Sequence, residues 1–312
     1  MADRTHPLDP GPEPDGRTVT ATDGVDYHVI TLGPDNPPPD RAPAVFLHGG
    51  GPGCSSWTDF GMVAPMFATD RTCHFVDLVQ YGKTAKPTIV GPRWSWLAKS
   101  MVALWDAMDL TAPADVVCNS WGGTIAIALA SEYPDRVRSL VITGSMPVFY
   151  GPLAPLPEGA RRGRRARDAY FGGEGPTMDK MRDLMADLEW YDRSLIPEAT
   201  VERRYLQSLD REEMELAAHS DDLRGDWQDL EGHLKTISCP TLFAWGMYDA
   251  FLTPDYPLML ARMVPRGQIY LMDHTSHHLQ EERPADYHRM VSAFLDSEQT
   301  PVVLPGGQET DR

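Results

Sequence analysis

The chain has 312 residues, of which 42% are hydrophobic, and its formal net charge at pH 7 is -17. This composition supports a substantial apolar core and excludes a chain that is disordered throughout. The acidic balance argues against nucleic acid as the main partner, because binding to phosphates needs a basic face. A small-molecule substrate remains compatible with it, since net charge of this size mainly keeps molecules apart in solution.

Both ends of the chain are polar and rich in proline or glycine. The first residues read MADRTHPLDPGPEPDGR and the last read TPVVLPGGQETDR. Such termini are commonly mobile, so we predict a mobile N-terminal arm over residues 1–17 and a flexible tail over 299–312. The sequence contains no apolar run typical of a secretory signal or a membrane span, which predicts no membrane partner.

The four cysteines are scattered along the chain. They are Cys54, Cys73, Cys118 and Cys239. None of them belongs to a C-x-x-C pair or has the spacing of metal ligands. Together with the polar N-terminus, this pattern predicts a reduced, cytoplasmic protein without a metal site.

Short apolar runs, each bounded by turn residues, recur along the chain and predict buried strands. In chain order they are residues 42–49, 73–78, 114–118, 139–144, 241–246 and 268–273. Helix-like segments over 94–108 and 122–133 flank the third of these runs. Strands that alternate with helices predict an α/β fold, with a mostly parallel sheet covered by helices.

The alternation breaks over residues 147–236, which are charged, contain no convincing strand and carry several helix-like segments. We predict that they form a helical lid, inserted into a core made by residues 18–146 and 237–298. Within the lid, residues 161–167 carry five arginines. The favoured interpretation is a solvated helix face that pairs with nearby acidic residues. The alternative is a positive field that draws an anionic substrate to the cleft.

The third predicted strand runs into the sequence VVCNSWGGTIAIA, which places Ser120 at a strand-to-helix turn. An activated serine at such a turn usually lies in the sequence G-x-S-x-G. Here Cys118 occupies the position of the first glycine, and Gly122 supplies the second. Ligands of open α/β sheets bind beyond the carboxyl ends of the strands, so Ser120 is a candidate nucleophile. Taken alone, these five residues also fit an ordinary turn serine.

Other segments whose residues could take part in catalysis lie after other predicted strands. Residues 46–57 read FLHGGGPGCSSW, and their glycines leave backbone N–H groups that can stabilise an oxyanion. They lack the spacing of a P-loop or a dinucleotide site. Asp249 follows the fifth strand, and His274, His277 and His278 follow the last. Each segment alone has a structural explanation, but the order Ser, Asp, His is that of the α/β-hydrolase triad.

Together these motifs resemble the α/β-hydrolase superfamily over nearly the whole chain. Within it the chain is most similar to the meta-cleavage product hydrolases, which are serine-dependent enzymes that hydrolyse carbon–carbon bonds. The resemblance rests on residues 49–57, 119–123, 245–249 and 277–282. It implies the α/β-hydrolase fold with a lid, a small-molecule substrate, and a reaction that needs neither a metal nor an organic cofactor.

The resemblance implies a catalytic triad. Ser120 would be the nucleophile, and the family's register selects His277 as the base over its neighbours. Asp249 would orient that histidine and stabilise its charged form. Asp273 is a less favoured substitute for Asp249.

The resemblance also implies the groups that surround the triad. The N–H groups of Gly50 and Trp121 would form the oxyanion hole. The substrate-binding residues would be Gly51, Asp59, Asn119, Arg204 and His278. Four positions depart from the family: Asp59 replaces an asparagine, His278 a tryptophan, Gln80 a glycine, and Cys118 the first glycine of the nucleophile turn. A carboxylate at position 59 should disfavour an anionic dienoate.

Several functions remain open for this triad. The preferred one is cleavage of a carbon–carbon bond in a vinylogous diketone-type ring-cleavage product of aromatic or alicyclic catabolism. A carboxylic ester or lactone hydrolase would use the same parts, as would a prolyl aminopeptidase-like hydrolase, whose motifs the sequence NSWGG also resembles. A ligand-binding protein with a vestigial hydrolase fold is disfavoured by the complete Ser-Asp-His set. Because similar hydrolases often form dimers or larger assemblies, a homodimer or higher homo-oligomer is also open.

Overall fold

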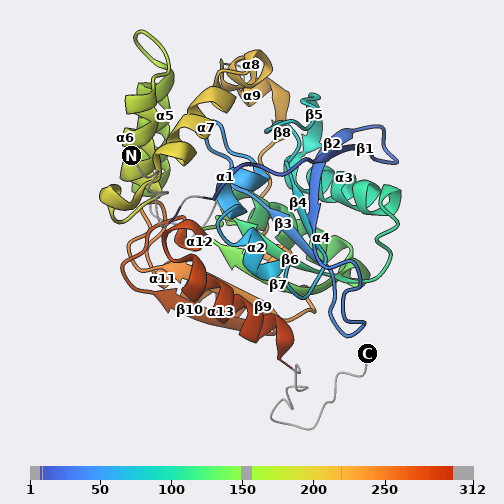
Figure 1. The fold of residues 1–312 in the computed structure, drawn as a ribbon. Coiled ribbons are helices and arrows are strands. Elements are labelled where there is room, and N and C mark those ends of the chain that lie inside the picture. Colours follow the sequence, from blue (N-terminus) through green and yellow to red (C-terminus); the bar gives the residue numbers. More distant parts are fainter. Residues whose placement is uncertain (1–7, 9, 149–156, 219, 298–312) are drawn as a thin grey trace, which may run out of the picture.

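A computed structural model describes residues 8, 10–148, 157–218 and 220–297 of the chain (Figure 1). The flexible tail predicted over 299–312 lies wholly outside the described residues, and the arm predicted over 1–17 lies partly outside them. Within the described ranges, no helix combines the length and the apolar character needed to cross a membrane.

A mixed, mostly parallel sheet forms the centre of the molecule, in the order β1-β2-β4-β3-β6-β7-β9-β10. The strands are β1 (Arg17–Thr20), β2 (Asp26–Leu32), β3 (Ala44–Leu47), β4 (Cys73–Val76), β6 (Ala114–Asn119), β7 (Val137–Thr143), β9 (Thr241–Gly246) and β10 (Gly267–Met272). Strand β2 is antiparallel to β1 and to β4, and all other neighbours are parallel. The predicted α/β fold and all of its predicted strands are therefore confirmed.

The structure also contains strands that the sequence pattern did not reveal. Strands β1 and β2 form an antiparallel pair at one edge of the main sheet. A second, small sheet pairs β5 (Ile89–Pro92) with β8 (Arg224–Asp226). The expectation that residues 147–236 contain no strand is therefore wrong at β8. This strand has only three residues, which is too short to show a period, and it depends on pairing with the distant β5.

Helices cover both faces of the main sheet and bury a separate apolar cluster on each. Along β6, Val116 and Cys118 belong to one cluster and Val117 to the other, because successive residues of a strand point to opposite faces. The first cluster includes side chains of α3 (Arg93–Ala107), α4 (Trp121–Glu132), α10 (Glu231–Leu234) and α11 (Asp255–Met263). The second includes side chains of α1 (Ser56–Phe60), α2 (Ala64–Phe67), α12 (Leu279–Glu282) and α13 (Pro284–Asp296). The helices predicted before and after the third strand are thus present as α3 and α4.

A helical insertion separates β7 from β9. Its helices are α5 (Pro157–Phe171), α6 (Met178–Leu188), α7 (Glu198–Ser208), α8 (Arg211–Ala218) and α9 (Ser220–Leu223). Helices α5, α6 and α7 share a third apolar cluster that includes Tyr170, Met181, Met185 and Val201. Figure 1 shows the insertion at one end of the molecule, away from α2 and α13. We call this insertion the lid.

Candidate active site

Ser120 occupies a sharp turn between β6 and α4. Its backbone has φ 49° and ψ -112°, which lies outside the regions that residues with a side chain normally adopt. Such a conformation costs on the order of 1–3 kcal/mol and is typical of functional sites. The turn is held in place because the Ser120 N–H donates to the Thr143 carbonyl at 2.7 Å. This geometry is that of a nucleophile elbow, which raises the serine hydroxyl above the edge of the sheet.

The turn tolerates Cys118 at the first glycine position of the motif but requires Gly122 at the second. Cys118 is fully buried among the apolar side chains beneath the turn. A Cβ atom on Gly122 would lie 2.1 Å from the Leu47 carbonyl oxygen, so no larger residue fits there. The missing glycine of the motif is therefore the replaceable one.

Asp249 and His277 form a buried pair at the ends of β9 and β10. The Asp249 Oδ2 and His277 Nδ1 atoms are 2.8 Å apart. The other carboxylate oxygen, Oδ1, accepts the N–H groups of Phe251 at 2.8 Å and Leu252 at 3.0 Å. These contacts fix the carboxylate, which in turn orients the imidazole so that its Nε2 atom can act as a base.

The neighbouring histidines are committed to other partners. His274 is exposed and lies 2.8 Å from Asp273, the less favoured candidate for the acid. His278 is buried and pairs through Nδ1 with Glu281. Of the three histidines, the structure therefore brings only His277 to Asp249.

The segment 143–144, at the end of β7, contacts both the nucleophile and the base. Thr143 accepts the Ser120 N–H through its carbonyl. Gly144 has φ 59°, and a Cβ atom on it would lie 2.4 Å from Cε1 of His277. The segment therefore contacts Ser120 through Thr143 and His277 through Gly144.

Replacing Gly144 by alanine is expected to lower kcat about 100-fold, because the added methyl group must displace the imidazole of His277. Steady-state kinetics with the substrate of this enzyme would measure the effect. Gly173→Ala is the matched control, since Gly173 has a similar φ of 65° but nothing within 4 Å of the added atom. Equal kcat values for the two variants would contradict the proximity of Gly144 to the base.

The loop after β3 lies against the nucleophile turn. A Cβ atom on Gly49 would be 3.4 Å from the Cβ atom of Ser120. A Cβ atom on Gly50 would be 2.7 Å from the indole ring of Trp121. The backbone N–H groups of Gly50 and Trp121 thus come from two segments in direct contact beside the nucleophile. This is the arrangement that an oxyanion hole requires.

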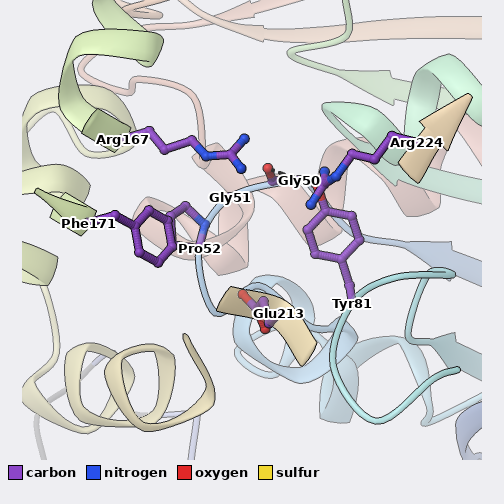
Figure 2. A pocket seen from close by; sticks show the side chains of 8 residues that line it. All are labelled: Gly50, Gly51, Pro52, Tyr81, Arg167, Phe171, Glu213 and Arg224. Carbon is purple, nitrogen blue, oxygen red and sulfur yellow. Dashed lines mark hydrogen bonds between the residues drawn. The ribbon is translucent and has the colours of Figure 1, made fainter. Parts of the chain in front are cut away.

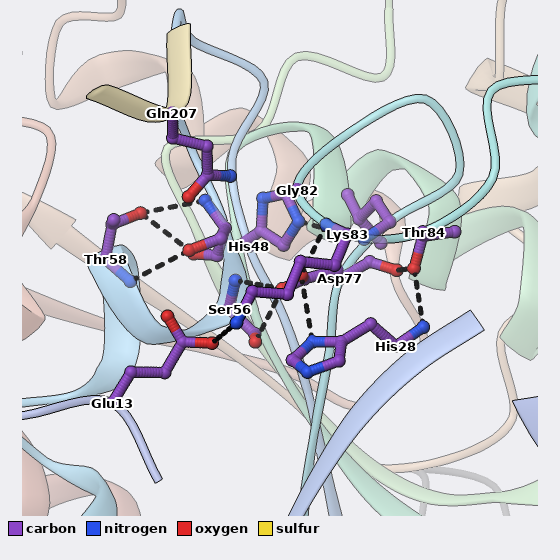
Figure 3. A network of polar contacts seen from close by, with 12 residues as sticks. Glu13, His28, His48, Ser56, Thr58, Asp77, Gly82, Lys83, Thr84 and Gln207 are labelled. Atoms are coloured by element: carbon purple, nitrogen blue, oxygen red, sulfur yellow. Dashed lines mark hydrogen bonds and ion pairs between the residues drawn. The ribbon is translucent and has the colours of Figure 1, made fainter. Parts of the chain in front are cut away.

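His48 fixes the start of this loop. Its Nε2 atom accepts the Leu78 N–H at 2.9 Å, so the proton of the neutral ring is on Nδ1. Nδ1 then donates to the Gly49 carbonyl at 2.7 Å. The geometry of the loop therefore depends on one tautomer of the buried His48 ring, which lies within the polar network of Figure 3.

Asp77 anchors the far side of the same loop (Figure 3). Its carboxylate accepts the Ser56 N–H at 2.9 Å and hydroxyl at 2.8 Å, and the Lys83 N–H at 3.0 Å. It also pairs with His28 at 3.1 Å. Burial opposes ionisation, but the hydrogen bond from His28, the nearby His48 ring and the Lys83 N–H outweigh it and lower the pKa of Asp77 to about 2. Asp77 thus supports α1 and the loop before it as a permanent anion.

The Asp59 carboxylate supports the glycine loop, residues 49–51, through a hydrogen bond. Its Oδ2 atom accepts the Gly49 N–H at 2.7 Å and lies 3.4 Å from the Asn119 amide nitrogen. Burial opposes ionisation of Asp59, yet His278, His48 and the Gly49 N–H together lower its pKa below the ordinary value. Asp59 and Asn119 therefore lie directly beneath the oxyanion loop.

Arg204 joins the lid helix α7 to the loop. Its side chain is 1% exposed and is paired with Glu189. Its guanidinium also donates to the Pro52 carbonyl at 2.9 Å and 3.2 Å. A Cβ atom on Gly51 would be 2.8 Å from its Nη2 atom. The structure thus places Arg204 and Gly51 in contact, with the charge of the arginine matched by a buried glutamate.

His278 belongs to the same buried group of charges. The backbone N–H of His278 donates to the backbone carbonyl of Glu189 at 3.0 Å. Burial lowers the pKa of His278, but Glu189, Glu281 and Asp59 outweigh that effect and raise it to about 9. Burial raises the pKa of Glu281 to about 7. His278 is therefore a cation near neutral pH.

Glu189 and Glu281 were not among the residues predicted from the sequence. A signal for Glu189 was present, because it continues the buried face of α6 at the spacing of Met181 and Met185. An acidic residue on an apolar helix face needs a partner, and here that partner is Arg204. Among the described residues, no group of three or more His, Cys, Asp or Glu side chains is placed to hold a metal ion.

Comparisons with known proteins show the family and the fold of the chain. The alpha/beta hydrolase fold family matches residues 43–284. A 2-hydroxymuconate semialdehyde hydrolase of Pseudomonas sp. strain CF600 is 31% identical over 258 residues, which cover 81% of this chain and 86% of that protein. A 2-hydroxy-6-oxo-2,4-heptadienoate hydrolase of Pseudomonas putida is 30% identical over 290 residues, which cover 91% and 97%. The structure of a 2-hydroxy-6-oxo-6-phenylhexa-2,4-dienoate hydrolase from Rhodococcus sp. strain RHA1 matches with a TM-score of 0.75 at 21% identity, covering 91% and 99%.

Proposed function

The chain belongs to the α/β-hydrolase family and is a hydrolase similar to the meta-cleavage product hydrolases, and from this premise we propose that it cleaves a carbon–carbon bond beside a ketone. The substrate would be a vinylogous diketone acid that arises from ring cleavage. One observation carries the proposal. The Asp249–His277 pair and Ser120 contact one segment, residues 143–144, in a chain that is 31% identical to a 2-hydroxymuconate semialdehyde hydrolase and 30% identical to a 2-hydroxy-6-oxo-2,4-heptadienoate hydrolase.

The first step is attack on the ketone. His277 accepts a proton at Nε2 as the Ser120 oxygen, or a water activated in the same way, bonds to the carbonyl carbon. Asp249 stabilises the imidazolium that forms. The N–H groups of Gly50 and Trp121 donate to the new oxyanion, which contributes roughly 3 kcal/mol per donor in the transition state.

The second step is cleavage of the carbon–carbon bond. In the diketo tautomer of the substrate, the electron pair of that bond passes into the adjoining enone, and this fragment leaves as a dienol after it takes a proton from His277. The other fragment remains as an acyl group on Ser120, and one water converts it to a carboxylic acid. When water attacks directly, the acid forms at once. On either route one water is consumed, two acids are released, and nothing is oxidised or reduced overall.

A substrate panel tests this proposal. The wild-type chain is expected to consume 2-hydroxy-6-oxo-2,4-heptadienoate, followed by the loss of its absorbance. Ser120→Ala should lower the rate by about ten-thousand-fold or more without changing the melting temperature. Ser131→Ala, near the far end of the following helix, is the matched control and should remain active, because the half-buried Ser131 only shares a hydrogen bond with Thr236. Rapid hydrolysis of 4-nitrophenyl acetate or proline 4-nitroanilide, with no cleavage of the diketone, would contradict the carbon–carbon assignment.

A further inference from the structure

Gln80 has a backbone conformation that residues with a side chain rarely adopt. Its φ is 72°, in the left-handed region that favours glycine, and glycine is the residue that Gln80 replaces relative to the family. The residue is only 1% exposed. A strained conformation persists only where the surrounding contacts maintain it, and such conformations cluster at functional places. The contacts of the Gln80 side chain are therefore informative.

The amide of Gln80 connects two segments that are far apart in the sequence. Its Nε2 atom donates to the Pro87 carbonyl at 2.7 Å and to the Leu223 carbonyl at 2.8 Å. Leu223 is the last residue of α9, so the second bond attaches the end of the lid to the core. A glycine at position 80 would adopt the backbone conformation without strain but could make neither bond.

The next residue of each segment makes a second bond in the opposite direction. Arg224 follows Leu223, and its Nη1 atom donates to the hydroxyl of Tyr81, which follows Gln80, at 2.6 Å. Residues 80–81 and 223–224 are therefore joined by one hydrogen bond from the core to the lid and one from the lid to the core. We call these four residues the clamp.

The clamp extends to Gly50. The Tyr81 hydroxyl accepts the bond from Arg224, so its own proton can be donated to the Gly50 carbonyl, which lies at 3.3 Å. All three residues line one pocket beside the oxyanion loop, between the lid and the core. Figure 2 shows Arg224 extending from β8 to the hydroxyl end of Tyr81. A distance of 3.3 Å is long for two oxygens, so the expected effect of this bond is moderate.

Gly50 depends on such support because it has no side chain of its own. The peptide group before it carries the Gly49 carbonyl, which His48 holds, and the Gly50 N–H, which points the opposite way in a trans peptide. The peptide group after it carries the Gly50 carbonyl, which Tyr81 holds. With both peptide groups held, the glycine loses its wide choice of backbone angles. The clamp therefore helps to set the direction of the Gly50 N–H.

The clamp also contacts the second oxyanion donor. The guanidinium of Arg224 lies 5.3 Å from the ring centre of Trp121, and the Tyr81 ring meets the Trp121 ring edge-on at 5.9 Å. Glu213, in the same pocket, interacts with the charge of Arg224. An acidic neighbour of this kind favours a structural role for Arg224 over the binding of an anion.

We propose that Gln80 and Arg224 are positioning residues, which act through Tyr81 to hold the Gly50 N–H in the direction that the oxyanion requires. An oxyanion hole is effective because its donors are fixed before the charge develops. The inference rests on the proposed function for the nucleophile, Ser120, and for Gly50 as a donor. It does not depend on which bond the enzyme cleaves.

Binding of 2,2,2-trifluoroacetophenone to the full-length protein tests the clamp. The Ser120 oxygen adds to this ketone, the serine proton passes to His277, and the carbonyl oxygen becomes an oxyanion. Fluorine NMR would give the affinity. We expect Gln80→Gly to weaken binding about ten-fold, which is less than the effect of removing a donor outright. The melting temperature should change little, because glycine relieves the backbone strain while it removes two hydrogen bonds.

A second variant tests the same connection with a smaller change. Tyr81→Phe removes the hydroxyl between Arg224 and Gly50 but keeps the aromatic ring, and it should also weaken binding of the ketone about ten-fold. The double variant with Gln80→Gly should bind within about two-fold of Tyr81→Phe alone, because both changes act on one path.

Two control variants separate positioning from general effects. Asp109→Gly relieves a left-handed φ of 56° at an exposed turn. Tyr27→Phe removes a buried hydroxyl that donates to Ser100 at 2.8 Å. Both should bind the ketone as the wild type does.

Several outcomes would overturn the clamp. They are an unchanged affinity in Gln80→Gly or in Tyr81→Phe, losses that add fully in the double variant, or an equal loss in either control. Failure of the wild type to form the ketone adduct would also overturn it, since there would be no oxyanion hole to position. The proposed function fails separately, when the ketone binds in the expected pattern but the diketone acid is not cleaved.

Discussion

Replacing Asp249 by asparagine is expected to lower kcat about ten-thousand-fold and to leave the fold intact. The reason lies in the two backbone N–H groups, of Phe251 and Leu252, that Oδ1 of Asp249 accepts. An asparagine must keep its oxygen on those donors, so its amide nitrogen faces His277. The imidazole then has to accept at Nδ1 and carry its proton at Nε2, where it can no longer take the proton of Ser120.

Steady-state kinetics across pH, together with thermal unfolding, would measure this effect. Asp273→Asn is the matched control, because Asp273 is the next candidate along the chain but is exposed and pairs with His274. It should retain kcat within a small factor. A large loss in Asp273→Asn, or near-normal activity in Asp249→Asn, would refute the assignment of the acid.

Replacing Arg204 by methionine is expected to lower the free energy of unfolding by about 3–5 kcal/mol. The change leaves the buried carboxylate of Glu189 without its cation and removes the donors to the Pro52 carbonyl. An uncompensated buried charge is more costly than a lost surface contact. Chemical denaturation monitored by tryptophan fluorescence would give the value.

A double variant separates the ion pair from simple packing. Arg204→Met combined with Glu189→Met removes both charges and should recover most of the lost stability, because apolar replacements of buried pairs are often neutral. Arg182→Met is the surface control, since Arg182 pairs with Glu198 at 2.7 Å between α6 and α7 but is more exposed. It should change stability by less than about 1 kcal/mol. Equal losses in the Arg182 and Arg204 variants would contradict the expected role of burial.

Most of the strands that the sequence predicted share one property. All except the edge strand β10 are short runs buried largely on both faces, such as Ala44–Leu47, and parallel strands in such a position read as continuous apolar segments. Strand β2 was not predicted, because it mixes polar and apolar residues and its buried His28 is paired with Asp77 from another segment. Burial of a polar residue with a distant partner leaves no local pattern.

The same limit applies to the site. Ser120 and Asp249 could be predicted, because each follows a recognisable strand and the order Ser, Asp, His is informative, whereas His277 was selected among three histidines by the family resemblance. The partners of the loop could not be predicted. Gly53 and Glu213, for example, are 160 residues apart, and no periodicity relates them.

The arginines of residues 161–167 include some whose position was predicted from the sequence and one whose position was not. Arg161 and Arg165 pair with Glu158 on an exposed face, as the favoured interpretation of residues 161–167 expected. Arg167, on the same helix, instead lines the pocket beside the oxyanion loop. The sequence places all of these arginines in one segment, but only the packing of α5 distinguishes them.

The hydrogen bonds between the lid and loop residues 52–54 have a consequence for the order of events. Arg204 reaches Pro52, Glu213 receives the N–H of Gly53, and Gln207 donates to the Cys54 carbonyl at 3.2 Å. A lid that moves away to admit a substrate must release the loop that carries Gly50. Such a molecule cannot admit a substrate and catalyse its reaction at the same moment. A molecule with an open lid has its nucleophile but lacks a fixed oxyanion hole, so a poorly fitting compound that fails to close the lid escapes unchanged.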